Sequence, residues 1–337
     1  MKTISVLTIT LLTALLVSCG GGSYSDEPDP GGPPVGGIGR TGLAVGPIST
    51  FGSVVVNGVR YDTTSTTITV DGQPATQSDL RVGQVVVVKG EVDDNQTTGT
   101  ADEIHFEENV KGPVQSIDIA TSRLVVLGQT VITGPDTSFD DNIQPASLDG
   151  LSVGDLVEVS GQTMADGSIV ATRIEMKPAG TAFEVHGTVS NLDGANFRFS
   201  INALTVDYSA ATLDDFPGGQ ISNGDFVEAK GNALNGNGAL TANQVEFKGS
   251  PVSGASGLYI EVEGFITRFV SAQDFDVGGV SVITNASTVF EGGVAAERLN
   301  NIMRDGARQH QWTFVDQHRA AFLGRGICAS FSDAPWN

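Results

Sequence analysis

The feature that most constrains this chain is a three-part pattern that recurs about every seventy residues. The first landmark is a glycine followed by a short apolar segment, and it begins at Gly46, Gly112, Gly187 and Gly264. The second is an apolar segment between two glycines, and it begins at Gly83, Gly154 and Gly224. The third is Ala-x-x-Ile or a close variant, and it begins at Ala101, Ala171 and Ala242. Because the three landmarks keep their order, the chain is a tandem array of one small unit.

Each unit is predicted to contain five β-strands. In the first unit, Val54-Val55-Val56 is followed by the turn residues Asn57-Gly58 and by Val59 and Tyr61. β-Branched residues between glycine and asparagine indicate strands joined by a hairpin. The fourth strand is the segment between the two glycines, and in the second unit we expect Glu158 to face water. A polar linker joins the third and fourth strands.

Five short strands in a unit of about seventy residues suit a small closed barrel of OB-like type. Closure removes the exposed edges that an open sheet of this size would present. A small sandwich is the alternative, and the sequence does not separate the two. The predicted fold class is therefore all-β, a tandem array of three complete barrels and one partial barrel, with no helical domain.

The combined pattern resembles a family of unknown function. It reads Gly-x-Val-x-x-Ile, then Thr-x-Phe, then Leu-x-x-Gly-Asp-x-Val-Glu-Val-x-Gly, then Ala-x-x-Ile, over roughly Gly46 to Phe290. These landmarks are similar to those of the family numbered five-six-six-six in the domain-of-unknown-function series, which occurs in tandem in bacterial lipoproteins. The resemblance implies a fold and a location in the cell envelope. It brings no catalytic residue, because the family has no assigned activity.

These signals divide the chain into seven segments. They are a lipoprotein signal peptide (1–18), a disordered Gly/Pro-rich tether (19–41), three β repeats (42–110, 111–180 and 181–252), a partial fourth repeat (257–296) and an atypical tail (297–337).

The first residues have the form of a secretory signal. Lys2 is followed by an apolar stretch, and the run Leu16-Val-Ser-Cys19 resembles the bacterial lipobox. In such signals the cysteine is diacylated and becomes the mature N-terminus, so Cys19 is the predicted lipid attachment residue. Two or more acyl chains hold a protein at a membrane far better than one chain does. We expect an envelope protein, anchored in the outer membrane and facing the periplasm or the cell surface; an ordinary signal peptide is the alternative.

The fourth unit departs from the pattern before it is complete. The expected strand between two glycines does not appear after Phe290, and residues 297–337 contain both tryptophans of the chain. A frameshift within the unit predicts such a break in mid-domain. A genuine helical or partner-binding extension is the other explanation.

Histidines and acidic runs are the candidate chemical residues. His105 and His186 hold positions at which the other units carry different residue types, so we expect solvated strand side chains. His310 and His318 lie in the tail at a spacing that fits no usual zinc site. Three acidic loop runs offer oxygen ligands typical of Ca²⁺: Asp93-Asp94-Asn95, Asp140-Asp141-Asn142 and Asp214-Asp215. None has the Asp-x-Asp-x-Asp-Gly loop, and the alternative is that they cap their own turns.

Composition excludes some function classes. The net charge of −21 repels phosphate backbones, so nucleic acid is not an expected partner. The sequence contains no nucleophile elbow and no phosphate loop. The residues that recur from unit to unit are glycines and apolar residues expected in the core, and we expect no set of polar residues to recur with them. We therefore expect a non-enzymatic protein without catalytic residue, metal or cofactor, whose partners are the membrane and an envelope protein or glycan. A ligand-binding module for polysaccharide or calcium is the second reading, and a hydrolase is the third.

Overall fold

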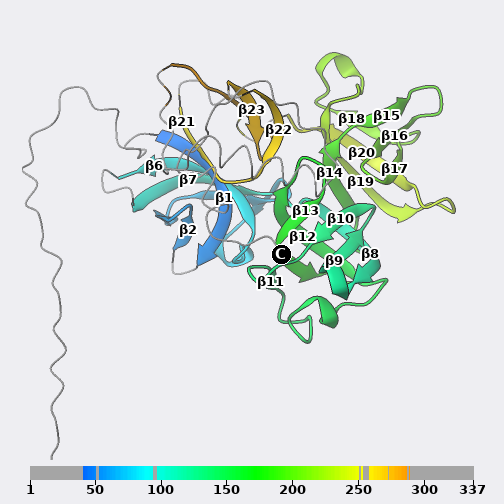
Figure 1. The fold of residues 1–337 in the computed structure, drawn as a ribbon, viewed down its shortest axis with the longest axis horizontal. Coiled ribbons are helices and arrows are strands. Elements are labelled where there is room, and N and C mark those ends of the chain that lie inside the picture. Colours follow the sequence, from blue (N-terminus) through cyan, green and yellow to red (C-terminus); the bar gives the residue numbers. More distant parts are fainter. Residues whose placement is uncertain are drawn as a thin grey trace, which may run out of the picture. The chain divides into compact units, whose positions relative to one another are not determined.

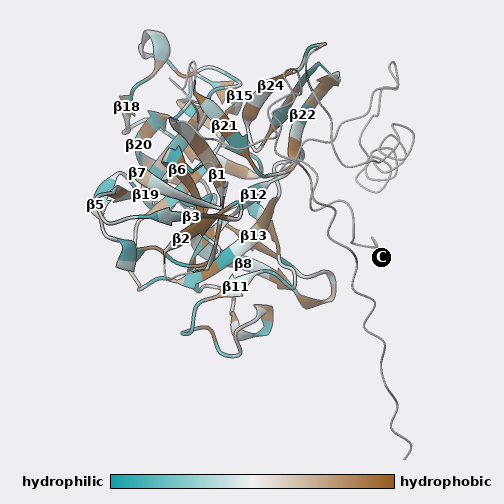
Figure 2. Cartoon of the chain, turned by 90° about the vertical axis from the view of Figure 1, so that its left-hand side faces the viewer, coloured by the Kyte–Doolittle hydropathy of each residue, from teal (hydrophilic) through white to brown (hydrophobic). Residues whose placement is uncertain are grey.

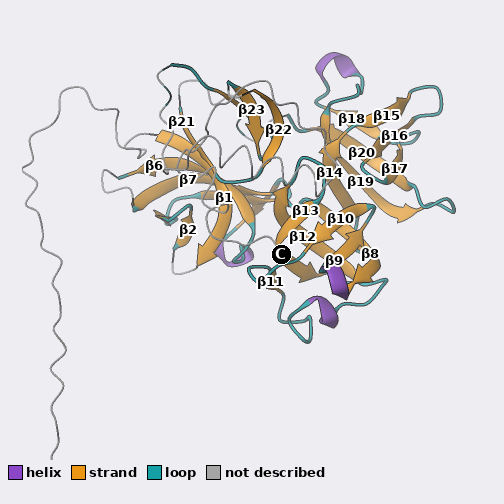
Figure 3. Ribbon diagram, in the orientation of Figure 1, coloured by secondary structure: helices purple, strands orange, loops and turns teal. Residues whose placement is uncertain are grey.

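The computed structural model describes residues 41–50, 53–93, 97–249, 252, 258–271, 273–286 and 288. In these ranges, β-strands make up nearly all of the regular structure, and the helices are four 3-10 turns of three residues each (Figure 3). No helix in the described ranges is long and apolar enough to cross a membrane. The prediction of an all-β array is confirmed.

The strands follow one another in the same pattern in each unit. The first unit contains β1 (Thr41–Thr50), β2 (Val54–Val56), β3 (Val59–Asp62), β4 (Thr67–Val70), β5 (Gln73–Ala75), η1 (Gln77–Asp79), β6 (Val85–Val92) and β7 (Thr98–Phe106). The second contains β8 (Val110–Asp118), η2 (Ile119–Thr121), β9 (Arg123–Val126), β10 (Gln129–Ile132), β11 (Ser138–Phe139), η3 (Leu148–Gly150), β12 (Leu156–Thr163) and β13 (Ile169–Met176). The third contains β14 (Phe183–Thr188), β15 (Ser190–Asp193), β16 (Arg198–Ile201), β17 (Leu204–Asp207), β18 (Thr212–Asp214), η4 (Pro217–Gly219), β19 (Phe226–Leu234) and β20 (Leu240–Phe247).

Each of these three units is a closed five-stranded barrel (Figure 1). In the second unit β8 pairs with β9, β9 with β10, and β10 runs parallel to β13. β13 then pairs with β12, which returns to β8 and closes the barrel. The first unit closes in the same order, and so does the third, whose first strand is divided into β14 and β15. A parallel pair between the third and fifth strands in a closed sheet is the OB-like arrangement, so the predicted barrel is confirmed and the sandwich is not.

The predicted polar linker contains a further short strand. β4, β11 and β18 each run parallel to the fifth strand of their unit. In the first two units a threonine fixes this strand, since Thr66 Oγ1 donates a hydrogen bond to the carbonyl of Ala101 and Thr137 Oγ1 donates one to that of Ala171, both at 2.7 Å. In the second unit this contact links the Thr-x-Phe and Ala-x-x-Ile landmarks, and the first unit has Thr66-Thr67-Ile68 in place of Thr-x-Phe.

Alternating side chains fill the barrels, and hydrophobic and hydrophilic residues alternate along the strands (Figure 2). Val157 and Val159 of β12 point into the core, as predicted. The buried side chains of the second and third units form one continuous hydrophobic cluster, whereas those of the first unit form a separate one. The second and third barrels therefore share a core, in part because β8 also pairs with β14.

A bulge requires the second glycine of the second landmark, which lies within each fourth strand. The pairing of the fourth and fifth strands shifts register at Gly90, Gly161 and Gly231. A Cβ atom at these positions would lie 2.1–2.3 Å from a carbonyl oxygen of the fifth strand. Such bulges bend a strand and increase its twist, which a barrel of five strands needs in order to close.

The described part of the fourth unit consists of β21 (Tyr259–Val262), β22 (Ile266–Ser271), β23 (Asp274–Val277) and β24 (Val280–Ile283). β22, β23 and β24 form a three-stranded sheet, and β21 runs parallel to β1 of the first unit. The predicted second and third strands of this unit are present as β23 and β24. The tail at 297–337 lies outside the described residues, as do the signal peptide at 1–18 and the tether at 19–41 except for Thr41, which begins β1.

The need for glycine at the bulge can be tested by substitution. Replacing Gly161→Ala should lower the free energy of unfolding by about 1–3 kcal/mol, because the new Cβ overpacks against the carbonyl of Val170. Gly134→Ala is the matched control, because a Cβ there meets no atom within 4 Å, and it should change stability by less than about 0.5 kcal/mol. Urea unfolding followed by circular dichroism measures both. Equal stability of the two variants would show that the bulge tolerates a side chain.

Candidate functional site at the junction of the repeats

Charged side chains are buried where the first three units meet. Glu108, Lys111, Glu158, Glu184 and Glu228 are each less than about a tenth exposed. They come from the connection between β7 and β8, and from strands β8, β12, β14 and β19. A charge removed from water is costly unless other charges or hydrogen bonds compensate it. This junction cluster is therefore the strongest candidate site in the described part of the chain.

The burial of Glu158 corrects the expectation that it faces water. The residue is 5% exposed, although it points away from the core of its own barrel. The first unit covers this outer face of β12, where the backbone N–H of Val85 donates a hydrogen bond to Ser160 Oγ at 2.8 Å. The alternating pattern of the strand correctly predicts that Glu158 points to the outer face of its barrel. The first unit lies over that face, so the side chain is buried.

A charged trio recurs in two units. In the second unit Lys177 Nζ lies 2.7 Å from a carboxylate oxygen of Glu158 and 3.2 Å from one of Glu175. The same three positions of the third unit hold Glu228, Glu246 and Lys248, with both lysine–carboxylate distances at 3.3 Å. The expectation that no polar constellation recurs with the repeat is therefore wrong. The sequence signal was a Glu-x-Lys that follows the Ala-x-x-Ile landmark in both units.

The residue before the first glycine of a unit also enters the cluster. Lys111 Nζ lies 2.9 Å from Glu108, 2.9 Å from Glu184 and 3.1 Å from Asp71. Lys111 faces Glu158 across β8 and β12, and His186 faces Glu228 in the same way across β14 and β19. One lysine is thus shared by three carboxylates from three parts of the chain.

The two described histidines differ in environment. His186 is not solvated as predicted: its side chain is 7% exposed and lies 3.4 Å from Glu228 and 3.6 Å from Glu107. The reason is that the connection between the first two units passes over it. His105 is a partly exposed strand residue, as expected, and its Nδ1 lies 2.7 Å from Thr69 Oγ1. His310 and His318 lie outside the described residues.

Two neighbouring carboxyl groups of the cluster, Asp71 and Glu108, have pKa values shifted in opposite directions. Burial, and then contact with Asp71, raise the pKa of Glu108 well above its usual range, and Lys111 only partly opposes this. Burial also acts on Asp71, but its contacts with Glu108 and Lys111 lower its pKa. The two pKa values therefore shift in opposite directions, and Glu108 takes up a proton more readily than Asp71 does.

Glu107, beside the cluster, is held charged by its partners, whereas burial raises the pKa of Glu158. Burial alone would raise the pKa of Glu107, but contacts with His186 and Lys248 lower it to about 2. Burial would lower the pKa of Lys111 and Lys248, yet the surrounding carboxylates raise both above the usual lysine value. The lysines consequently remain charged at all physiological pH values.

The acidic loops behave differently from the junction cluster. Asp140 Oδ1 accepts hydrogen bonds from the backbone N–H and the side-chain amide of Asn142. Asp214 accepts from Gln244 Nε2, and Asp93 accepts from Thr98 Oγ1. The partners of Asp140 and Asp93 lie in their own loops, which agrees with the turn-capping alternative, whereas Asp214 is bound by β20. Asp94 and Asn95 lie outside the described residues, as does Cys19.

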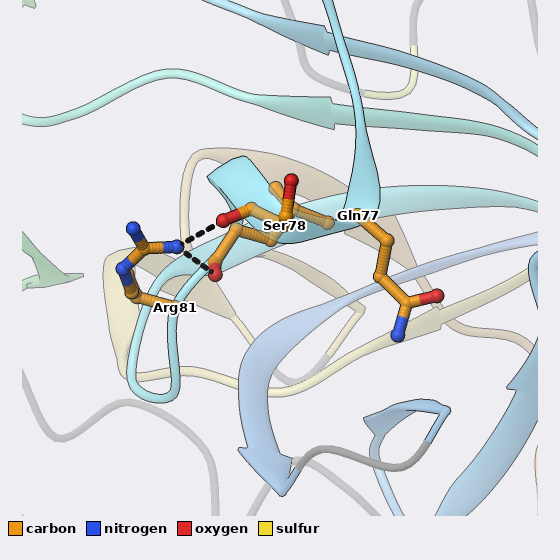
Figure 4. A pocket seen from close by; sticks show the side chains of 4 residues that line it. Gln77, Ser78 and Arg81 are labelled. Carbon is orange, nitrogen blue, oxygen red and sulfur yellow. Dashed lines mark hydrogen bonds between the residues drawn. The ribbon is translucent and has the colours of Figure 1, made fainter.

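A cavity of about 470 Å³ lies beside η1 in the first unit and is lined by Gln77, Ser78, Leu80 and Arg81 (Figure 4). Arg81 Nη1 donates hydrogen bonds to the carbonyl oxygens of Ser78 and Leu80. Since the guanidinium binds its own loop and no general base lines the cavity, these groups do not form an arrangement for nucleophilic catalysis.

Comparison with known families accounts for the repeats. The sequence model described as "Domain of unknown function (DUF5666)" matches residues 45–105, 111–175, 186–246 and 255–304, well over half of the chain. The chain belongs to this family. The four matches agree with the predicted tandem array, and the fourth extends a few residues beyond the break expected at residue 297. No curated protein matches the chain.

The junction gives a second test. Lys111→Met should cost about 3–5 kcal/mol of unfolding free energy, because it leaves buried carboxylates without their shared cation. Lys89→Met is the matched control. Lys89 pairs with Glu103 at 2.8 Å, but both side chains are about 40% exposed, so its loss should cost less than about 1 kcal/mol. Urea unfolding of both variants makes the comparison, and a cost at Lys111 as small as that at Lys89 would contradict the role given to the cluster.

Proposed function

We propose that this protein is a non-enzymatic, lipid-anchored protein of the bacterial cell envelope whose tandem barrels have a structural or protein-interaction role. The run Leu16-Val-Ser-Cys19 and the Gly/Pro-rich segment after it support the anchor and tether. Membership of a family of unknown function is compatible with this role and names no activity.

The observation that best supports the non-enzymatic part is the use made of the buried polar groups. Lys111 and Glu184 join the second and third units, and Asp71 extends the same contact to the first. The carboxylates and lysines that recur with the repeat therefore serve contacts between or within barrels. Groups committed to such contacts are not available as general acids or bases towards a substrate.

The proposed partners follow from the anchor and from charge. A tether of about twenty residues after Cys19 gives a reach on the order of 25 Å, so the barrels would act close to the bilayer. A net charge of −21 favours partners that carry positive charge over nucleic acids or anionic surfaces. An envelope protein with a basic surface fits both conditions, and an uncharged glycan near the bilayer fits the first.

The anchor is tested at its attachment residue. Cys19→Ala should move the protein from the membrane fraction to the soluble fraction and abolish its labelling by palmitate, because the acyl chains supply the membrane affinity. Cys328→Ala is the matched control, since it removes the other cysteine of the chain and should leave both properties unchanged. Envelope fractionation with radiolabelled palmitate measures them. Continued sedimentation and labelling of the Cys19→Ala protein would rule out the anchor.

A further inference from the structure

Three carboxylates of the junction cluster converge from separate parts of the fold. Asp71 lies in the turn between β4 and β5, Glu108 in the connection between β7 and β8, and Glu158 in the middle of β12. One oxygen from each lies within 4.8 Å of the others. Two ligands on opposite sides of a calcium ion are separated by about 5 Å, so one cation can reach all three. We propose that Asp71, Glu108 and Glu158 bind a hard divalent cation.

The second observation is that one buried oxygen of Glu108 lacks a partner. Its side chain is fully buried, and its Oε2 atom accepts no hydrogen bond from any described residue. Asp71 Oδ1 is also buried without a hydrogen-bond donor. These oxygens contrast with those of Asp140, which cap their own turn. Buried polar atoms without partners are rare in folded proteins and often mark a bound ion or water.

The neighbouring lysines do not neutralise these oxygens. Lys111 Nζ approaches Asp71 at Oδ2 and Glu108 at Oε1, and it also binds Glu184. Lys177 is divided between Glu158 and Glu175. Each lysine is thus shared by more than one carboxylate. The second oxygens of Asp71 and Glu108, which Lys111 does not contact, remain able to bind another cation. Burial, and then contact with Asp71, raise the pKa of Glu108, so a proton and a metal ion compete for this position.

The ligand chemistry selects the class of ion. Every ligand of the set is a carboxylate oxygen, with no imidazole or thiolate among the three. Oxygen-only sites favour Ca²⁺, Mg²⁺ or Mn²⁺ over zinc or copper. Because Asp71 belongs to the first unit and Glu158 to the second, the ion would connect the two barrels directly. This inference does not depend on the membrane anchor.

The binding experiment uses the purified full chain after treatment with EDTA. Mn²⁺ is titrated at neutral pH and the free ion is measured by electron paramagnetic resonance. We expect saturable binding of one Mn²⁺ per chain below about 1 mM, with displacement by Ca²⁺ or Mg²⁺ identifying the preferred ion. Each ion that binds should also raise the Tm, since it binds the folded state only. Absence of Mn²⁺ binding together with an unchanged Tm in all three ions would overturn the proposal.

Variants locate the site. Glu108→Gln keeps the shape of the side chain and should weaken Mn²⁺ binding at least tenfold. Asp71→Asn is the second variant, and because Asp71 is partly exposed in a turn it should fold even if Glu108→Gln does not. Asp140→Asn is the matched control in an acidic loop and should bind as the unmodified protein does. Binding that survives both junction variants, or that is lost in Asp140→Asn, would contradict the assignment.

A shared proton is the competing occupant of the same carboxylates. It predicts no metal binding, together with a Tm that rises as the pH is lowered through the raised pKa of Glu108 in the unmodified protein and not in Glu108→Gln. The direction follows because a group whose pKa is raised by folding stabilises the protein in its protonated form. That combination of results would replace the metal ion by the proton.

Discussion

Lys111 is the side chain on which the junction of the first three units depends. It belongs to the second unit, and its Nζ lies about 3 Å from carboxylates of the first unit, of the connection and of the third unit. Buried ion pairs contribute little net stability once their desolvation is counted, but they penalise any arrangement that separates them. A slip of one residue in β8 would present Val110 or Gly112 to these carboxylates. The charge therefore fixes the register of β8 against both β12 and β14.

The contacts continue from Lys111 through the array. Glu184 binds Lys111 and Lys230, and Lys230 and Lys248 both bind Glu228. Lys248, at the end of the third unit, then reaches Glu107 at 2.7 Å, in the connection between the first two units. Segments that are 141 residues apart in the sequence are joined in this way. Charged contacts, strand pairing and the common core thus make the barrels interdependent, although each barrel closes on its own.

Much of the fold was predictable from the sequence because its determinants are local. Glycines mark the bulges, alternating valines mark the strands, and the period gives the number of units. The sequence predicts a linker at the parallel strand β11, since two residues are too few to show alternation. The junction cluster was missed for a different reason. The burial of Glu158 depends on the neighbouring unit, and Asp71 and Glu108 have no charged counterparts in the other units.

The distribution of charge indicates which faces of the barrels are buried by other segments of the array. Glu158 and Glu228 hold the same position in the second and third units, where other segments cover the outer face of the fourth strand, and the first unit has Val87 there. A glutamate thus occupies this position in the units where lysines contact it and another segment buries it. Acidic residues in the loops, such as Asp140 and Asp193, cap turns at the surface and stay accessible. A partner of the proposed envelope protein would therefore meet the loop ends of the barrels, while the recurring charges of the strands remain within the array.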